Sequence, residues 1–210
     1  GAVAPQLQAV MVTIWKSKLK FSNSTSAILI GPGLAAPGVA GKLKAPMRKL
    51  WRESQLPMVV DASALDWLPL GELQTNAIRV ITPHPGEAAR LLKTTAKIVQ
   101  ADRVKALRKI SKLFGHCWVV LKGHQTMVGR STGEIFVNPS GNPHLAQGGS
   151  GDVLAGFIAG LLAQPELSAD AGKTIRYAVW QHGAAADALQ ARSSNWIIEE
   201  LASKCGGLRP

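Results

Sequence analysis

Residues 148–158 read GGSGDVLAGFI, a glycine-rich stretch that runs directly into an apolar one. The apolar part continues to Leu162, which is the length of a helix rather than of a strand. A glycine-rich loop that opens a helix presents unpaired backbone N–H groups and the positive end of the helix dipole, and this combination binds phosphate or a developing anion. We therefore predict that Gly149, Ser150 and Gly151 form an anion hole at the start of a helix.

Asp152 ends the glycine-rich stretch and allows two interpretations. It could cap the helix, which would contribute about 1 kcal/mol. It could instead act as the catalytic base that takes a proton from a hydroxyl attacking phosphorus. Capping needs one residue and no run of glycines, so we favour the catalytic role. Neither the Walker pattern nor the dinucleotide Gly-x-Gly-x-x-Gly pattern is present, so another phosphate-binding class is required.

The chain before this stretch alternates short apolar runs with longer amphipathic ones. The expected strands are 27–30, 58–60, 78–81 and 118–121, and the expected helices between them are 39–54 and 102–114. Two further β runs, 126–128 and 135–137, suggest an antiparallel hairpin at a sheet edge. Helices are expected at 153–163, 173–189 and 195–203. The pattern predicts one α/β domain spanning 1–210, a doubly wound and mainly parallel sheet with helices on both faces.

Polar residues and glycines follow the predicted strands at one end. Gly31-Pro32-Gly33 follows the first strand, Asp61 the second, His84 lies just after the third and Lys122 follows the fourth. Ligands bind at the carboxyl ends of the strands in an open parallel sheet. Each residue alone has a structural explanation, as a turn, a cap or a satisfied polar group. Their coincidence on one rim predicts a binding site there.

The formal charge of +11 results from 24 Lys and Arg against 13 Asp and Glu. It is compatible with nucleic acid, an acidic membrane surface or small anionic ligands. Many cations, such as those at 42–49 and 103–112, have the spacing of solvated helix faces. A basic arm, a zinc-ligand cluster and an aromatic RNA-binding signature are all missing from the sequence, so neither nucleic acid nor membrane is an expected partner.

Cys117 and Cys205 make neither a disulfide framework nor a metal site, which indicates a reducing compartment. The sequence shows neither a signal-peptide pattern nor a run of 18 apolar residues, so a cytoplasmic location is expected. Trp51 and Trp67 are expected to be exposed and could belong to an interface as readily as to the core, and a homo-oligomer is the expected state.

Four segments together resemble one known family. Gly149-Ser150-Gly151-Asp152 matches the Gly-x-Gly-Asp motif of the ribokinase-like superfamily. The segments 82–87 (TPHPGE), 121–126 (LKGHQT) and 138–143 (NPSGNP) resemble its NAD(P)H-hydrate dehydratase branch, and the similarity runs from about Ala27 to Leu189. The resemblance implies a lyase that repairs hydrated NADH or NADPH. It uses ADP or ATP with Mg²⁺ to phosphorylate the ring hydroxyl, which is then eliminated as phosphate.

The resemblance also implies roles for individual residues. Asp152 would be the base on the hydroxyl and would touch the substrate, beside Gly33 and His84. The N–H groups of Gly149 to Gly151 would hold the transferring phosphoryl group, and Mg²⁺ would sit on the nucleotide phosphates without a dedicated protein site. The expected nucleotide-binding residues are Lys122, Gly123, His124, Gln125, Thr126, Asn138, Asn142 and Gly151. The His-Pro-Gly-Glu form resembles bacterial members, which favours ADP as the donor.

Three features depart from the family pattern. The usual N-terminal unit has no counterpart before Ala27, so this unit is expected to be absent and the substrate pocket incomplete. Ala35 and Ser63 stand where the family has Gly and Asp. Two alternatives therefore stay open: a small-molecule kinase of the same superfamily, and a truncated domain that binds nucleotide without turnover.

Overall fold

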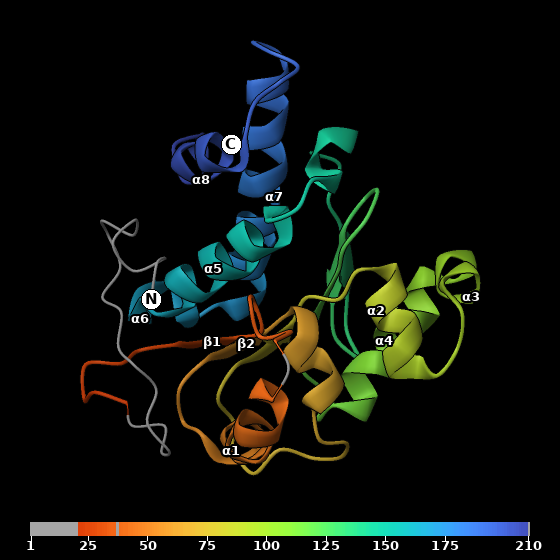
Figure 1. Cartoon of the computed structure of the whole chain (residues 1–210), viewed down its shortest axis with the longest axis vertical. Coiled ribbons are helices and arrows are strands. Elements are labelled where there is room, and N and C mark those ends of the chain that lie inside the picture. Colours follow the sequence, from red (N-terminus) through yellow and green to blue (C-terminus); the bar gives the residue numbers. More distant parts are fainter. Residues whose placement is uncertain (1–20, 37, 210) are drawn as a thin grey trace.

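The computed structural model describes residues 21–36 and 38–209, in which a six-stranded sheet carries helices on both faces (Figure 1). The strands are β1 (Ile28–Ile30), β2 (Met58–Val60), β3 (Arg79–Ile81), β4 (Trp118–Leu121), β5 (Met127–Gly129) and β6 (Ile135–Val137), and they lie side by side in chain order. The pairs from β1 to β4 are parallel, and β4-β5 and β5-β6 are antiparallel. The predicted parallel sheet with a hairpin at its edge is confirmed.

Helices fill the connections between the parallel strands and the whole C-terminal part. The helices are α1 (Val39–Glu53), α2 (Pro85–Leu92), α3 (Ala96–Ala101), α4 (Arg103–Leu113), α5 (Ser150–Leu162), α6 (Pro165–Ser168), α7 (Ala171–Gln190) and α8 (Ile198–Lys204), with 3₁₀ turns η2 (Ala62–Trp67) and η3 (Pro143–Ala146). None of the described helices is both long and apolar enough to span a membrane.

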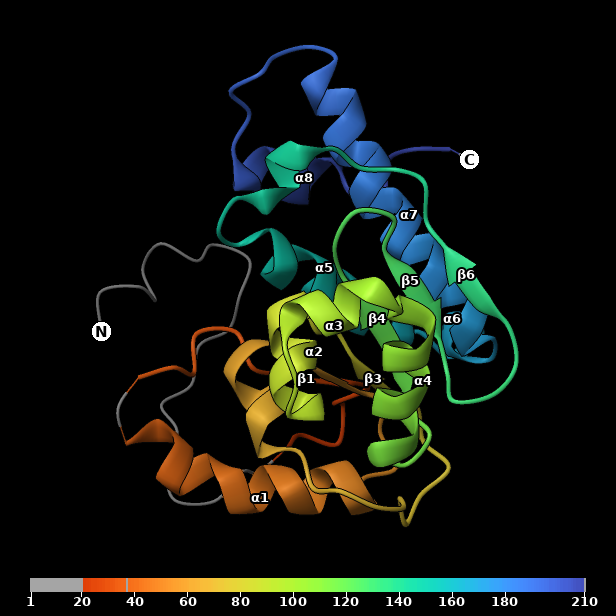
Figure 2. The ribbon, with the colours of Figure 1, turned by 90° about the vertical axis from the view of Figure 1, so that its right-hand side faces the viewer.

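Successive strand residues point to opposite faces, as pleating requires, and two cores result. On one face, Val60, Ile81 and Leu121 share a core with α1, α2 and α4, which Figure 2 shows on the same side of the sheet. The other face packs against α5 and α7. Its strand residues are Val59, Val80, Val120 and Val128. The parallel strands are therefore buried on both faces, which explains their continuous apolar runs.

Arg79 is a charged side chain in the first core, with only 2% of its surface exposed. Its guanidinium lies at the C-terminal end of α1, where helix carbonyls lack partners within the helix. It donates hydrogen bonds to the carbonyl oxygens of Leu50, Trp51, Ser54, Leu56 and Ile78, at distances of 2.5–3.2 Å. Burial lowers the pKa of Arg79 to about 10, so the group stays charged at neutral pH.

Several predictions from the sequence are wrong in detail. Helices α2 and α3 were not expected, and α5 begins at Ser150 rather than at 153. Trp51 and Trp67 are buried, at 0% and 6% exposure, and offer no surface for an interface. Most cations of α1 and α4 are exposed as predicted, but Arg103 and Arg108 are partly buried. Most of the stretch before Ala27, where the family's first unit is expected to be missing, lies outside the described residues.

Candidate functional site

The N-terminus of α5 has the backbone that the anion-hole prediction requires. Gly149 is the N-cap, with φ +89°, and no side chain caps the helix. Ser150 and Gly151 open the first turn, so the N–H groups in this turn are free of the capping that a Ser or Asp would supply. Asp152 is the third helical residue, exposed and without a capping hydrogen bond. The structure therefore excludes the N-cap interpretation of Asp152.

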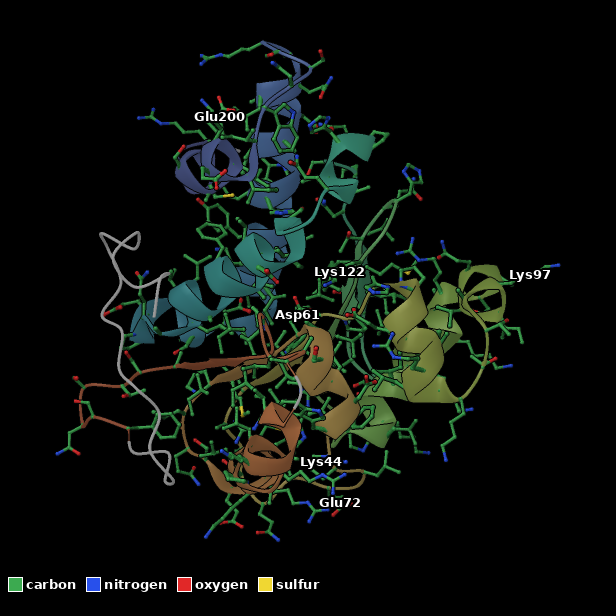
Figure 3. All side chains as sticks on the ribbon, in the orientation of Figure 1. Lys44, Asp61, Glu72, Lys97, Lys122 and Glu200 are labelled. Atoms are coloured by element: carbon green, nitrogen blue, oxygen red, sulfur yellow. The ribbon has the colours of Figure 1, made fainter. Side chains whose placement is uncertain are left out.

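Lys122, at the carboxyl end of β4, places a cation against this turn. Its Nζ lies 2.8 Å from Asp61 Oδ1, at the carboxyl end of β2. A Cβ on Gly151 would lie 3.1 Å from Lys122 Nζ and 3.6 Å from Asp61 Oδ2, so a larger residue here would displace the ammonium by a few tenths of an ångström. Figure 3 shows Asp61 and Lys122 together near the centre of the molecule, between α5 and α2. The positive helix end and the ammonium converge on the same space.

His84 and Glu87 form the start of α2 beside this ion pair. His84 Nδ1 accepts hydrogen bonds from the N–H groups of Gly86 and Glu87, while Glu87 Oε2 accepts from His84 N at 2.7 Å. This reciprocal arrangement is a capping box. Glu87 is also 3.9 Å from Lys122 Nζ, so two buried carboxylates flank one ammonium. His84 therefore has a structural role, and its half-exposed ring remains available to a ligand on the rim.

The loop after β4, residues 122–126, is bonded to Arg103 of α4. Its guanidinium donates to the carbonyl oxygens of Leu121, Lys122, His124 and Gln125. The other side of the loop faces solvent, and its exposed residues are Gly123, His124 and Gln125. Thr126 Oγ1 donates to Gly123 O at 3.1 Å. Burial lowers the pKa of Arg103, which still carries the charge that draws these carbonyls together.

Asn138 and Asn142 lie on a loop whose side chains mostly bond within it. Asn138 Nδ2 donates to Ser140 O at 3.0 Å, and its Oδ1 accepts from Ser140 Oγ. Asn142 Oδ1 accepts from His144 N, and its Nδ2 donates to Asp187 Oδ1 at 3.0 Å. Both amides therefore fix the shape of the loop here.

Gly33, assigned to the substrate side, has φ +73° and open space around its Cβ position. The neighbouring Gly31 approaches the Asp61 backbone so closely that a Cβ would lie 2.6 Å from Asp61 C. This contact fixes the β1 loop against the residue that pairs with Lys122. Ala35, where the family has glycine, does not have positive φ, so the substitution costs no strain.

Two cavities lie away from the ion pair of Lys122 and Asp61. One, of about 280 Å³ and mostly apolar, adjoins the substrate-side loop between β1 and α1. The larger, about 660 Å³, is lined by residues such as Cys117, Arg130 and Asp170 at the opposite, amino end of β3 and β4. At the candidate site, side chains from the carboxyl ends of β2 and β4 converge on the start of α5.

Three residues near the predicted set were not assigned from the sequence. Asp61 was placed on the rim but given no role, and Glu87 was quoted only as part of its motif. His182 of α7 was missed: its Nε2 lies 3.0 Å from Ser150 O and 3.3 Å from Ser150 Oγ. Desolvation by burial lowers the pKa of His182 to about 4, a hydrogen bond to the Ser150 backbone opposes this, and nearby Lys122 adds to it. The neutral ring lies directly beneath the anion hole.

Among the described residues, no group of three His, Cys, Asp or Glu is arranged to hold a metal. Mg²⁺ commonly binds through one or two carboxylates together with substrate phosphates. Asp61 and Glu87 are engaged by Lys122, and a Mg²⁺ that arrives on the nucleotide phosphates stays a prediction.

Comparison with known proteins gives a consistent result. A family model described as NAD(P)H-hydrate dehydratase matches residues 2–205. An ADP-dependent (S)-NAD(P)H-hydrate dehydratase from Neisseria meningitidis is 45% identical over 184 residues, 85% of this chain and 56% of that protein. The chain thus spans little more than half of this relative.

Solved structures agree. The ADP/ATP-dependent NAD(P)H-hydrate dehydratase from Bacillus subtilis, co-crystallised with ATP and Mg²⁺, has a TM-score of 0.72 at 30% identity, covering 86% of this chain and 62% of that one. A ribokinase-like superfamily protein from Enterococcus faecalis has a TM-score of 0.70 at 28% identity, covering 87% and 62%. The predicted ribokinase-like fold is confirmed.

Proposed function

The chain belongs to the NAD(P)H-hydrate dehydratase family, and on that premise we propose that it restores NADH and NADPH from their hydrated forms at the expense of ADP or ATP. Hydroxide is a poor leaving group and phosphate a good one. Transfer of a phosphoryl group to the ring hydroxyl, with loss of its proton, forms a phosphate ester and releases AMP or ADP. Cleavage of the C–O bond then releases phosphate, and loss of a proton from the adjacent ring carbon restores the double bond.

One observation carries this proposal: Lys122 Nζ lies against Gly151 at the uncapped N-terminus of α5. A phosphoryl group at this point would meet backbone N–H groups, the helix dipole and an ammonium together. Such groups stabilise the charge that phosphoryl transfer spreads over the equatorial oxygens. Mg²⁺, carried on the nucleotide, would add charge neutralisation to the same phosphates.

The remaining residues take their proposed roles around this point. Asp152, exposed on the first turn, takes the proton from the ring hydroxyl. Gly33 and His84 lie on the side of the hydrated dinucleotide. The nucleotide side consists of two loops, 122–126 and 138–142.

The decisive experiment is recovery of 340 nm absorbance from hydrated NADH, with ADP and ATP supplied in turn together with Mg²⁺. We expect recovery, with ADP the better donor, and loss of recovery without loss of nucleotide binding in Asp152→Asn. Asp170→Asn is the matched control, because Asp170 caps α7 and lines the cavity at the opposite end of the sheet. Full activity of Asp152→Asn would remove the role given to that residue.

Other outcomes would select the alternatives. A stable phosphorylated product in a screen of small alcohols would indicate a kinase. Nucleotide binding by calorimetry without recovery of absorbance would indicate a binding domain without turnover.

We also propose that the chain forms one domain over 1–210 and works as a homo-oligomer in the cytoplasm. The two cores share the same strands, which supports a single domain. Both cysteines are free, in keeping with a reducing compartment. Light scattering coupled to size exclusion tests the oligomer, and a monomer at all concentrations would refute it.

A further inference from the structure

Helix α7 contacts both the first turn of α5 and the loop of residues 138–142, and none of its residues belongs to the motifs at 82–87, 121–126, 138–143 or 149–152. His182 bonds to Ser150, the first residue of α5. Further along α7, Asp187 bonds to the loop of residues 138–142. The first turn of α5 and this loop are thus attached to one helix at two points.

The attachment of the 138–142 loop is specific. The carboxylate of Asp187 accepts from Gly141 N at 2.8 Å and from Asn142 Nδ2 at 3.0 Å. Ser140 Oγ donates to Trp180 O of the same helix at 3.0 Å. Gly141 has φ +106°, a conformation that favours glycine. Its N–H is held in this conformation by the bond to Asp187.

Gly183 sets how closely the loop and helix approach. A Cβ at this buried position would lie 2.6 Å from the carbonyl carbon of Ser140, which would force the loop away. The loop therefore rests on the helix backbone itself. On the inner side, Ala185 and Ala186 are fully buried and pack with Trp196 and Leu201 in a third hydrophobic cluster, which anchors this part of α7.

We infer that α7 sets the separation between loop 138–142 and the anion hole, and that Asp187 is a positioning residue for this loop and His182 one for the first turn of α5. The inference rests on the proposed function, because it concerns the same site. Asp187 is exposed, so core packing does not account for it. Its two bonds instead immobilise the loop assigned to the nucleotide, and displacement of such a loop by about 1 Å can cost a hundredfold in rate.

The test compares Asp187→Ala and Gly183→Ala with Asp170→Ala. Asp170 caps α7 at its other end through Lys173 N and touches neither loop, so its loss costs stability alone. For the first two variants we expect the Kd for ADP or ATP with Mg²⁺ to rise about tenfold or more. We expect hydrogen exchange at residues 139–146 to accelerate, and Asp187→Asn, which keeps one acceptor, to be intermediate. Asp170→Ala should leave both measurements unchanged.

His182→Ala should act on the first turn of α5. It should lower turnover and accelerate exchange at 149–152, with a smaller change in nucleotide Kd, and His182→Gln, which can still donate to Ser150 O, should restore part of the turnover. Unchanged exchange at 139–146 in Asp187→Ala, or an unchanged Kd, would overturn the inference. If the parent chain neither binds nucleotide nor restores NADH, the proposed function fails. Unaltered hydrogen exchange at 139–146 in Asp187→Ala and at 149–152 in His182→Ala would separately refute the role given to α7.

Discussion

Lys122 Nζ lies 2.8 Å from Asp61 Oδ1, which ties the carboxyl end of β4 to that of β2 across the intervening β3. Only 17% of the Lys122 side chain and 2% of the Asp61 side chain are exposed. Breaking a buried ion pair by removing one partner leaves an uncompensated charge, and the usual cost is about 3–5 kcal/mol. The pair is thus a structural link as well as part of the candidate site.

The first prediction concerns this pair. Lys122→Met should lower the free energy of unfolding by about 3 kcal/mol, because it leaves the Asp61 and Glu87 carboxylates without their cation. The double variant Lys122→Met with Asp61→Asn should lose less than the sum of the single variants. Urea unfolding measures all four proteins. Strict additivity would show that the two groups do not interact in solution.

The second prediction separates two adjacent glycines. Gly149→Ala should destabilise the protein by about 1 kcal/mol, because the residue has φ +89°. It should also lower turnover, since the change re-orients the first N–H groups of α5. Gly148→Ala is the matched control: Gly148 has no positive φ and nothing within 4 Å of its Cβ position. Equal losses in the two variants would contradict the proposed anion hole.

The third prediction concerns Arg79. Arg79→Met should reduce the free energy of unfolding by about 3 kcal/mol or more, because several buried carbonyl oxygens lose their donor. Arg79→Lys keeps the charge but not the planar fork, and should fall between Met and the parent. Arg52→Met is the control on the neighbouring helix, where an exposed guanidinium makes one long bond to Leu70 O. A comparable loss of unfolding free energy in Arg52→Met would show that removal of any positive charge destabilises the protein, whether or not the buried carbonyl oxygens keep their donor.

The fourth prediction follows from the pKa of His182, lowered to about 4 by burial. The unfolded state binds a proton near the ordinary value of 6.5, whereas the folded state binds one only near 4. Stability is therefore retained above pH 6.5 and lost as the pH falls toward 4, by about 3 kcal/mol from this group. His182→Gln should lack this component. Denaturant titrations of both proteins at several pH values give the difference, and parallel curves would refute it.

The parallel part of the sheet was predictable because its inner strands are buried on both faces and so appear as unbroken apolar runs, such as Met58–Val60. Helix α2 was not, because Pro83, Pro85 and Gly86 are typical of loops. In the structure Pro85 occupies the first helical turn, where proline is favoured, and His84 replaces the usual Ser, Thr, Asp or Asn as the cap.

The candidate site shows a similar division. The pairing of Asp61 with Lys122 follows from the rule that parallel strands bring their carboxyl ends together. His182 and Asp187 gave no signal, since polar residues at these spacings resemble the ordinary polar positions of an amphipathic helix. Their partners Ser150 and Gly141 lie more than thirty residues away, and only the tertiary packing of α7 brings them into contact.

The order of the strands bears on how the chain is made. Each strand neighbours the next one in sequence, and α1, α2 and α4 cover one face as soon as they emerge. The opposite face is covered by α5 and α7, which follow all six strands in the sequence. Its buried strand residues are Val59, Val80, Val120 and Val128. During synthesis, from amino to carboxyl end, a nascent chain therefore carries an uncovered valine-rich surface until α5 and α7 leave the ribosome.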